Sequence, residues 1–252
     1  MTATRAGRLR RVEHCMGTVF SLDVRDPDVD PAAADEAIGW LHRVDALFST
    51  YRPDSDISRL RRGEITLADC APQVRTVLER CAQLHEATDG YFDIHATGQL
   101  DPSGYVKGWA IERASDLLQA AGSANHCING GGDVQCLGVP EPGRYWQVGV
   151  ADPRDRSRIV ATVSGSPLAV ATSGTAERAR HIIDPHTTQA PNAFASITVI
   201  GRQLAETDAH ATAAFAMGDR APDWLRERRR QALLVRTDGT TIRIADTQLR
   251  RR

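Results

Sequence analysis

The 252-residue sequence is nearly without lysine. Lys107 is the only one, and every other residue among the 31 basic side chains is an arginine. A GC-rich coding sequence explains much of this bias, but it does not explain why one lysine is kept. The ammonium group of lysine is more compact than a guanidinium and differs from it in hydration and donor geometry. We therefore treat Lys107 as a candidate site residue.

Paired cysteines and long apolar runs are missing as well. The five cysteines are odd in number and include no C-x-x-C pair, which argues against a disulfide framework and a zinc site. We expect buried free thiols in a reducing compartment. No run approaches about 18 apolar residues, no apolar signal segment opens the chain, and Cys15 does not follow a lipobox. The expectation is a cytoplasmic protein without a membrane anchor.

The chain also lacks an excess of either charge. Its 31 basic and 32 acidic residues give a net charge of -1, and aromatic residues make up only 5% of the sequence. A nucleic-acid-binding surface needs clustered positive charge, with aromatic side chains where bases stack. Arginine runs such as RERRR at 226–230 are interpreted as solvated faces, so no nucleic-acid partner is expected.

The spacing of apolar residues changes along the chain and predicts both strands and helices. Residues 16–24 alternate as in a strand, while apolar positions in 30–49 recur at helical spacing. Further helices are predicted over 71–87, about 107–121, about 205–217 and near 222–231, with short strands over 126–201. A final hairpin is predicted to turn at Asp238-Gly239.

No linker or repeat interrupts this pattern. We therefore predict one α+β domain over residues 1–252, with a mixed β-sheet core flanked by helices. A C-terminal helix and hairpin at 222–245 complete it.

The helix predicted from ETDAHATAAFAMG carries two oxygen-bearing side chains on one face. Asp208 and Thr212 are four residues apart, which places a carboxylate and a hydroxyl one turn from each other. Hard oxygen ligands suit Mg²⁺ or Ca²⁺, and Mg²⁺ commonly completes its shell with water and phosphate oxygens. The competing interpretation is that Thr207 or Asp208 caps the helix and Thr212 bonds back to a carbonyl.

Three other segments suit a phosphate-bearing ligand. The glycine run INGGGDV (128–134) lets a backbone approach a ligand or simply forms a tight turn, and its spacing is not that of a dinucleotide fingerprint. LDPSGYVKGW (100–109) opens a helix, with Asp101, Ser103, Gly104 and Lys107 near an N-terminus that attracts phosphate. In ATSGTAERARHIIDPHT (171–187), His181 stands among charged residues, and we expect them to perturb its pKa. Spacing alone supports Mg²⁺-assisted chemistry on a phosphate-bearing ligand.

Taken in order, the segments of this chain resemble one known family. MGTVFSLDV, FSTYRPDSDISRL, DGYFDI, LDPSGYVKGWAIERA, INGGGDV, TSG, HIIDPHT and TDAHATAAFAMG are similar to the successive motifs of the FAD:protein FMN transferases, the ApbE-like flavin transferases. The resemblance runs from about residue 14 to residue 218. It implies an enzyme that binds FAD and Mg²⁺, transfers the FMN half to a Thr or Ser hydroxyl of a target flavoprotein, and releases AMP.

The resemblance also implies roles for particular residues. It places the flavin against Met16, Tyr51, Tyr91, Phe92 and Asp93, and the FAD ribose and phosphates near Asp101 and Lys107. The same groove would be lined by Thr172, Ser173, His181 and Ile182. The metal ligands would be Asp208, Thr212 and the carbonyl of Gly104. His181 or Asp101 is the candidate base for the acceptor hydroxyl, with Lys107 steadying phosphate charge.

The sequence departs from the usual family pattern in two places. DPSGYVKG has Pro102 and Ser103 where the family has Leu and Gly, and the connection between GYFDI and LDPSG is short. Two alternatives keep the same motifs: an FAD pyrophosphatase, in which water replaces the acceptor hydroxyl, and a protein that binds FAD without transferring it. Members of the family are commonly exported, whereas this chain shows no export signal.

Overall fold

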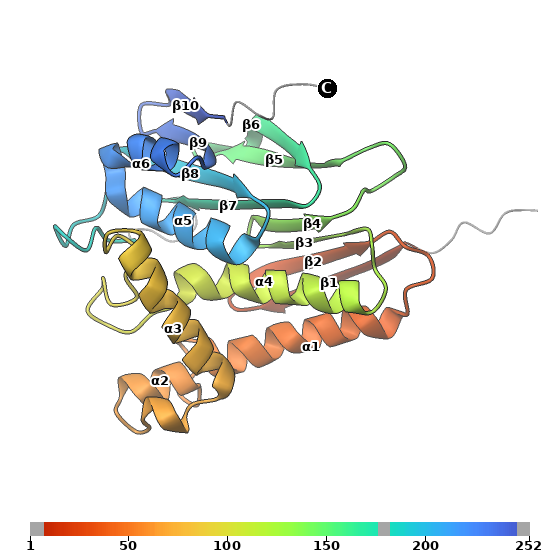
Figure 1. Ribbon diagram of the computed structural model, residues 1–252, viewed down its shortest axis with the longest axis horizontal. Helices are drawn as coiled ribbons and strands as arrows, with labels where there is room; N and C mark the ends of the chain where they lie inside the picture. Colours follow the sequence, from red (N-terminus) through yellow and green to blue (C-terminus); the bar gives the residue numbers. More distant parts are fainter. Residues whose placement is uncertain (1–7, 176–181, 246–252) are drawn as a thin grey trace, which may run out of the picture.

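The computed structural model describes residues 8–175 and 182–245, in which helices and strands form an α+β fold, as predicted (Figure 1). The strands are β1 (Leu9–Cys15), β2 (Thr18–Val24), β3 (His126–Gly130), β4 (Asp133–Leu137), β5 (Trp146–Asp152), β6 (Asp155–Gly165), β7 (Leu168–Gly174), β8 (Phe194–Gly201), β9 (Gln231–Arg236) and β10 (Thr241–Ile244). The α-helices are α1 (Pro31–Phe48), α2 (Asp56–Arg61), α3 (Pro72–Ala87), α4 (Ser103–Ala120), α5 (Leu204–Met217) and α6 (Ala221–Glu227). Short 3₁₀ turns lie at Leu67–Asp69 and Gly218–Arg220.

The main sheet has eight strands in the order β1-β2-β3-β4-β7-β8-β9-β10. Every neighbouring pair in it is antiparallel, so the prediction of a mixed sheet was wrong in this respect. Short turns join β1 to β2, β3 to β4 and β9 to β10, and such turns allow only antiparallel pairing. The other neighbours are joined by longer segments and are antiparallel as well. β5 and β6 form a separate two-stranded ribbon.

Alternating side chains of the sheet are buried on both of its faces. On β7, Ala169 and Ala171 belong to the core shared with the helices, whereas Leu168 and Val170 pack with Trp146 of the β5–β6 ribbon. α4 packs against β3 and β4, α5 packs against β7 and β8, and α1 lies against α4 (Figure 1). The molecule therefore has a helical layer, a sheet and a partial third layer made by the ribbon.

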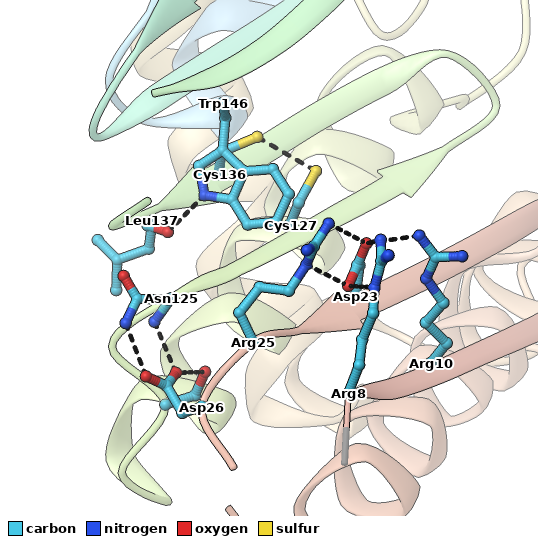
Figure 2. A network of polar contacts seen from close by, with 11 residues as sticks. Arg8, Arg10, Asp23, Arg25, Asp26, Asn125, Cys127, Cys136, Leu137 and Trp146 are labelled. Atoms are coloured by element: carbon cyan, nitrogen blue, oxygen red, sulfur yellow. Dashed lines mark hydrogen bonds and ion pairs between the residues drawn. The ribbon is translucent and has the colours of Figure 1, made fainter. Parts of the chain in front are cut away.

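A polar network ties the edge of the sheet together away from the helices (Figure 2). Arg8, Arg10 and Arg25 surround the Asp23 carboxylate, with Arg25 Nε 2.8 Å from Asp23 Oδ1. The Arg25 guanidinium also lies over the Trp146 ring, 5.2 Å from its centre. The N-terminal arginines thus have a structural partner on β2.

Helix boundaries follow the local signals closely, with one consequential exception. Asp30 accepts the Ala32 N–H at 2.9 Å and starts α1 where its cap predicts. α4, in contrast, begins at Ser103 because Asp101 Oδ1 accepts the Ser103 N–H at 3.0 Å. Lys107 therefore lies in the second turn of the helix, not in its first as predicted.

The C-terminal part departs from prediction in two details. α6 ends at Glu227, several residues before the predicted end at 231. The last hairpin turns through three residues rather than two, since Arg236 and Thr240 still pair and Gly239 takes the positive φ of 91°.

The burial of the cysteines and the apolar character of the helices were also predicted from the sequence. The five cysteines are free, but Cys127 is only partly buried, contrary to the expectation that all would be buried. Among the helices of the described residues, none has both the length and the apolar character needed to cross a membrane.

Candidate active site

A cavity of about 1050 Å³ opens at the end of the sheet where α4, α5 and the end of β7 meet. It brings together every predicted site residue that the structure describes: Met16, Tyr51, Tyr91, Phe92, Asp93, Asp101, Gly104, Lys107, Thr172, Ser173, Ile182, Asp208 and Thr212. His181 lies outside the described residues. The roles suggested for these side chains remain predictions, but their convergence on one cavity is a property of the fold.

Two tight hairpin turns form one wall of the cavity. The β1–β2 turn has Met16 at φ 49° and Gly17 at φ 69°, and the β3–β4 turn has Gly131 at φ 60° and Gly132 at φ 95°. A Cβ on Gly131 would lie 2.9 Å from Thr18 Oγ1, so glycine lets the turns pack together. The glycine run is therefore a turn that also lines the cavity, and the two interpretations left open by the sequence are compatible.

An ammonium group stands between two buried carboxylates at the base of this wall. Lys107 Nζ forms an ion pair with Asp133 Oδ2 and lies 3.6 Å from Asp208 Oδ2. The Asp133 and Asp208 side chains are 1% and 4% exposed, whereas that of Lys107 is 27% exposed. Lysine is thus the one of the three groups that also reaches solvent in the cavity.

Asp133 is the site residue that the sequence reasoning missed. Its carboxylate directly follows the glycine run, and its Oδ1 accepts the Thr172 N–H, 3.0 Å away. It thereby joins β4 to β7 and to the lysine of α4. The available signal was a lone acidic residue directly after a Gly-Gly turn in a chain with a single lysine.

Asp208 is fixed at the contact between α4 and α5. Its Oδ2 accepts the Gly108 N–H at 3.0 Å, and burial raises the pKa of the carboxyl while Lys107 opposes that shift. The helix begins at Leu204, and Asp208 bonds to another helix rather than to its own N-terminus. Capping by Thr207 is excluded as well, because its hydroxyl donates to the Gln203 carbonyl at 2.6 Å. The capping interpretation of this segment is therefore wrong.

Thr212 lies one turn further along α5 and faces two other site residues. Its Oγ1 is 3.4 Å from Ser173 Oγ, and a Cβ on Gly104 would lie 3.2 Å from that same Oγ1. Among the described residues, no three His, Cys, Asp or Glu side chains gather around a point. The arrangement of Asp208, Thr212 and the Gly104 backbone instead resembles the open, oxygen-only set that Mg²⁺ uses with a phosphate ligand.

Aromatic side chains also line the cavity, and the Phe92 ring lies beside Gly104, where a Cβ would be 3.4 Å from it. Tyr91 is buried, its hydroxyl accepts a hydrogen bond from Arg220 at 2.8 Å, and its ring contacts His186 edge-to-face. Phe92 is held by its backbone N–H, which donates to Thr88 Oγ1 at 2.9 Å. Tyr51, in contrast, is 82% exposed at the cavity rim. Rigid buried rings and one exposed ring suit the binding of a flat aromatic ligand.

The β5–β6 ribbon contributes a further wall that the sequence did not predict. Residues 149–153 line the cavity at the turn of the ribbon. They carry no motif, and only the placement of the ribbon across the sheet brings them there. Sequence periodicity predicts a strand in this segment but not the layer in which it packs.

The sequence of the chain matches a known protein family. Residues 16–98 and 95–234 match the sequence model of the ApbE family. A protein of Rhodobacter capsulatus named FAD:protein FMN transferase is 31% identical over 206 residues, an alignment that covers 78% of this chain and 36% of that longer protein. A Vibrio cholerae protein of the same name is 24% identical over 267 residues, covering 81% of this chain and 80% of the relative.

Solved structures share the fold. The flavin transferase ApbE from Vibrio cholerae superposes with a TM-score of 0.84 at 22% identity, over 96% of this chain and 99% of the other. The ApbE protein from Thermotoga maritima superposes with a TM-score of 0.85 at 21% identity, over 98% and 100% of the two chains. At these identities the comparison concerns the fold alone.

Proposed function

The chain belongs to the ApbE family, and from that membership and the cavity we propose that it is an FAD:protein FMN transferase. It would bind FAD and Mg²⁺, transfer the FMN half to a Thr or Ser hydroxyl of a target flavoprotein, and release AMP. The observation that carries the proposal is the cluster of Lys107, Asp208 and Thr212 beside an aromatic-lined cavity. This cluster offers groups for a pyrophosphate, and the aromatic part offers a surface for a flavin ring.

The cavity residues fit a divalent cation. Asp208 would contribute its carboxylate to the cation, and the Gly108 N–H, which donates to Oδ2, holds that side chain in place. Thr212 Oγ1 and the carbonyl of Gly104 would supply the remaining protein ligands. When bound, Mg²⁺ would neutralise the charge that develops on the pyrophosphate as AMP leaves.

The protein's own groups would then orient the reactants. Lys107, held by Asp133, presents its ammonium to the cavity and would bind a phosphate oxygen. Tyr91, Phe92 and Met16 would fix the isoalloxazine ring, which sets the direction in which the pyrophosphate lies. Binding holds FAD, the cation and the acceptor in a fixed arrangement. The entropy cost of bringing these reactants together, which is a large part of the barrier to group transfer, is then no longer part of the chemical step.

The acceptor hydroxyl needs a base to take its proton. Asp101 lines the cavity at the start of α4, where its Oδ1 accepts the Ser103 N–H. A carboxylate has a second oxygen, so the hydrogen bond from Ser103 does not prevent Asp101 from accepting a proton. His181 is the other candidate, and the two are separated by the pH dependence of single variants.

Three outcomes of one experiment separate this function from its alternatives. Purified protein is incubated with FAD, Mg²⁺ and a flavoprotein fragment that bears an acceptor Thr, and AMP, free FMN and protein-bound flavin are measured. The proposal predicts AMP in equal amount to FMN bound covalently to the fragment. AMP with free FMN would indicate a pyrophosphatase instead, and intact bound FAD would indicate a protein that only binds the dinucleotide.

A further inference from the structure

Asp133 is a buried carboxylate beside the cavity, and its only part in the proposed reaction is to hold Lys107. Its side chain is 1% exposed, and it stands at the first residue of β4, immediately after the Gly131-Gly132 turn. Oδ1 accepts the Thr172 N–H at 3.0 Å, while Oδ2 forms the ion pair with Lys107. The carboxylate is thus oriented by the backbone of the sheet, and the flexible lysine adapts to it.

We propose that Asp133 is a positioning residue that holds Lys107 away from Asp208 and so keeps Asp208 available to a divalent cation. The inference rests on the proposed function, since it concerns the cation of that same site. Lys107 Nζ is in contact with Asp133, whereas its 3.6 Å distance to Asp208 Oδ2 exceeds that of an ordinary hydrogen bond. The ammonium is therefore shared unequally between the two carboxylates.

The charges of Asp133, Lys107 and Asp208 determine how strongly the site attracts a cation. Two carboxylates and one ammonium leave a net charge of about -1, which attracts a dication, and burial of the two carboxylate side chains strengthens that attraction. Without the Asp133 charge, Lys107 would have Asp208 as its remaining carboxylate partner. The ammonium would then compete directly with the cation for Asp208, and the net attraction would be lost as well.

The first test measures Mn²⁺ binding to the protein without FAD, by electron paramagnetic resonance. Asp133→Asn keeps an oxygen for the Thr172 N–H but removes the charge that holds Lys107. We expect its Mn²⁺ affinity to fall roughly 10-fold to 100-fold, the usual cost of losing a group that orients a metal ligand. Asp45→Asn is the matched control, because Asp45 also lines the cavity and should leave Mn²⁺ affinity within about twofold.

A double-mutant cycle shows whether Asp133 acts through the lysine. In a Lys107→Met background no ammonium competes for Asp208, so Asp133→Asn should weaken Mn²⁺ binding much less than in the wild type. An equal loss in both backgrounds would overturn the positioning role, and so would unchanged affinity in Asp133→Asn or the absence of Mn²⁺ binding by the wild type. Since no flavin is present, failure of the transferase assay leaves this result unaffected.

A second and independent observation concerns two thiols on the other face of the sheet. Cys127 of β3 and Cys136 of β4 are directly opposite in the register, with their Sγ atoms 3.2 Å apart (Figure 2). Counted from the closing pair Gly130–Asp133 of the hairpin, they occupy a non-hydrogen-bonded pair, where opposite side chains come closest. Cys15, Cys70 and Cys81 lie elsewhere in the chain and are buried.

We infer that Cys127 and Cys136 form a reversible cross-strand disulfide with each other. The oxidant is a low-molecular-weight disulfide such as oxidised glutathione. The partly exposed Cys127 thiolate attacks one sulfur of the oxidant and expels a first thiolate. Cys136 then loses its proton and attacks Cys127 Sγ, which expels the second. Two protein thiols are oxidised and one small disulfide is reduced to two thiols.

The order of attack follows from the surroundings of the two sulfurs. The hydrogen bond to Cys127 and burial raise the pKa of the Cys136 thiol, so Cys136 is the poorer first nucleophile. It is also held next to Cys127 by the strand pairing, which makes its attack on the mixed disulfide intramolecular.

The test counts thiols. The folded protein is exposed to oxidised glutathione, freed of it, unfolded and alkylated, and the modified peptides are mapped by mass spectrometry. We expect a monomer in which Cys127 and Cys136 resist alkylation until a reductant is added, while Cys15, Cys70 and Cys81 are alkylated. Cys136→Ser should instead retain glutathione on Cys127. Alkylation of all five cysteines in the wild type, or disulfides that involve other cysteines or a second chain, would overturn the inference.

Discussion

Gly108 of α4 donates its backbone N–H to Asp208 Oδ2 of α5, 3.0 Å away, at a point where the two helices touch. A Cβ on Gly108 would lie 2.7 Å from Asp208 Cβ and 2.7 Å from the Leu204 carbonyl oxygen. Only glycine allows this approach, because backbone atoms on one side cannot move aside cheaply. The contact that packs the helices therefore also orients the carboxylate proposed to bind the cation.

Gly108→Ala should destabilise the protein despite the better helix propensity of alanine. Overpacking at a rigid contact costs about 1–3 kcal/mol, which outweighs the gain of about 1 kcal/mol from replacing a helical glycine. Urea unfolding followed by circular dichroism measures the difference. Gly39→Ala in α1 is the control: the nearest atom to its Cβ is a flexible arginine end at 3.4 Å, so this variant should be neutral or slightly more stable. Equal stability of both variants would contradict the packing argument.

Lys107→Arg should be a damaging substitution in a protein that otherwise uses arginine throughout. A guanidinium is planar and wider than an ammonium and cannot occupy the same position between Asp133 and Asp208. We expect kcat for flavin transfer to fall by on the order of 10-fold to 100-fold, the cost of a misplaced group in an active site. Steady-state kinetics of Lys107→Arg and Lys107→Met measure it. Wild-type rates in the arginine variant would show that charge alone matters at this position.

Tyr51→Ala should weaken FAD binding without changing stability. The side chain is 82% exposed at the cavity rim, so truncation removes little that is buried in the free protein. An aromatic contact with the flavin makes roughly a tenfold difference in Kd. Tyr145, 62% exposed and away from the residues that line the cavity, provides the matched control as Tyr145→Ala. Fluorescence titration with FAD should separate the two variants, while their melting temperatures should agree.

Stability should decline as the pH falls from about 6.5 toward 4. Burial lowers the pKa of His126 to about 4, and burial, then the charges of Arg230, Arg228 and Arg80, lower that of His210 to about 4. The unfolded chain takes up protons on these rings below its ordinary pKa of about 6.5, whereas the folded protein does not until about pH 4. Acid therefore favours unfolding across that window, by on the order of 3 kcal/mol or less for each buried ring.

Urea unfolding between pH 7.5 and 4.5 tests this prediction. His210→Gln should reduce the slope of stability against pH, because one of the two rings no longer titrates in the unfolded chain. His14→Gln, at an exposed position, should leave the slope unchanged. A slope that is the same in all three proteins would contradict the assignment.

The sequence was most informative where structure depends on neighbours along the chain. α1 begins after Asp30, and its apolar stripe and length follow from helical spacing, so its bounds were predicted almost to the residue. The pairing of Asp208 with Thr212 on one face of α5 needs only the helix period. Both depend on local geometry that the sequence alone specifies.

The sequence was least informative where distant segments meet. Asp133 and Lys107 are brought together by the packing of α4 on β3 and β4. The spacing of apolar residues in the sequence does not predict this packing. The β5–β6 ribbon forms a wall of the cavity through its position over β4 and β7, and a strand pattern does not say which layer a strand joins. α4 begins at Ser103, earlier than the predicted start at about residue 107, and the Asp101 side chain accepts the Ser103 N–H at that point.

The most direct measurement of the central claim is covalent flavin on an acceptor protein. The protein, FAD, Mg²⁺ and a flavoprotein fragment with an acceptor Thr are incubated together, and the denatured fragment is examined for flavin fluorescence in a gel. We predict a fluorescent fragment with the wild type, none when the acceptor Thr is replaced by Ala, and a loss of on the order of 100-fold or more with Asp208→Asn. Undiminished labelling by Asp208→Asn would contradict the role given to the α4–α5 contact, and an unlabelled fragment accompanied by free FMN would contradict the transferase function itself.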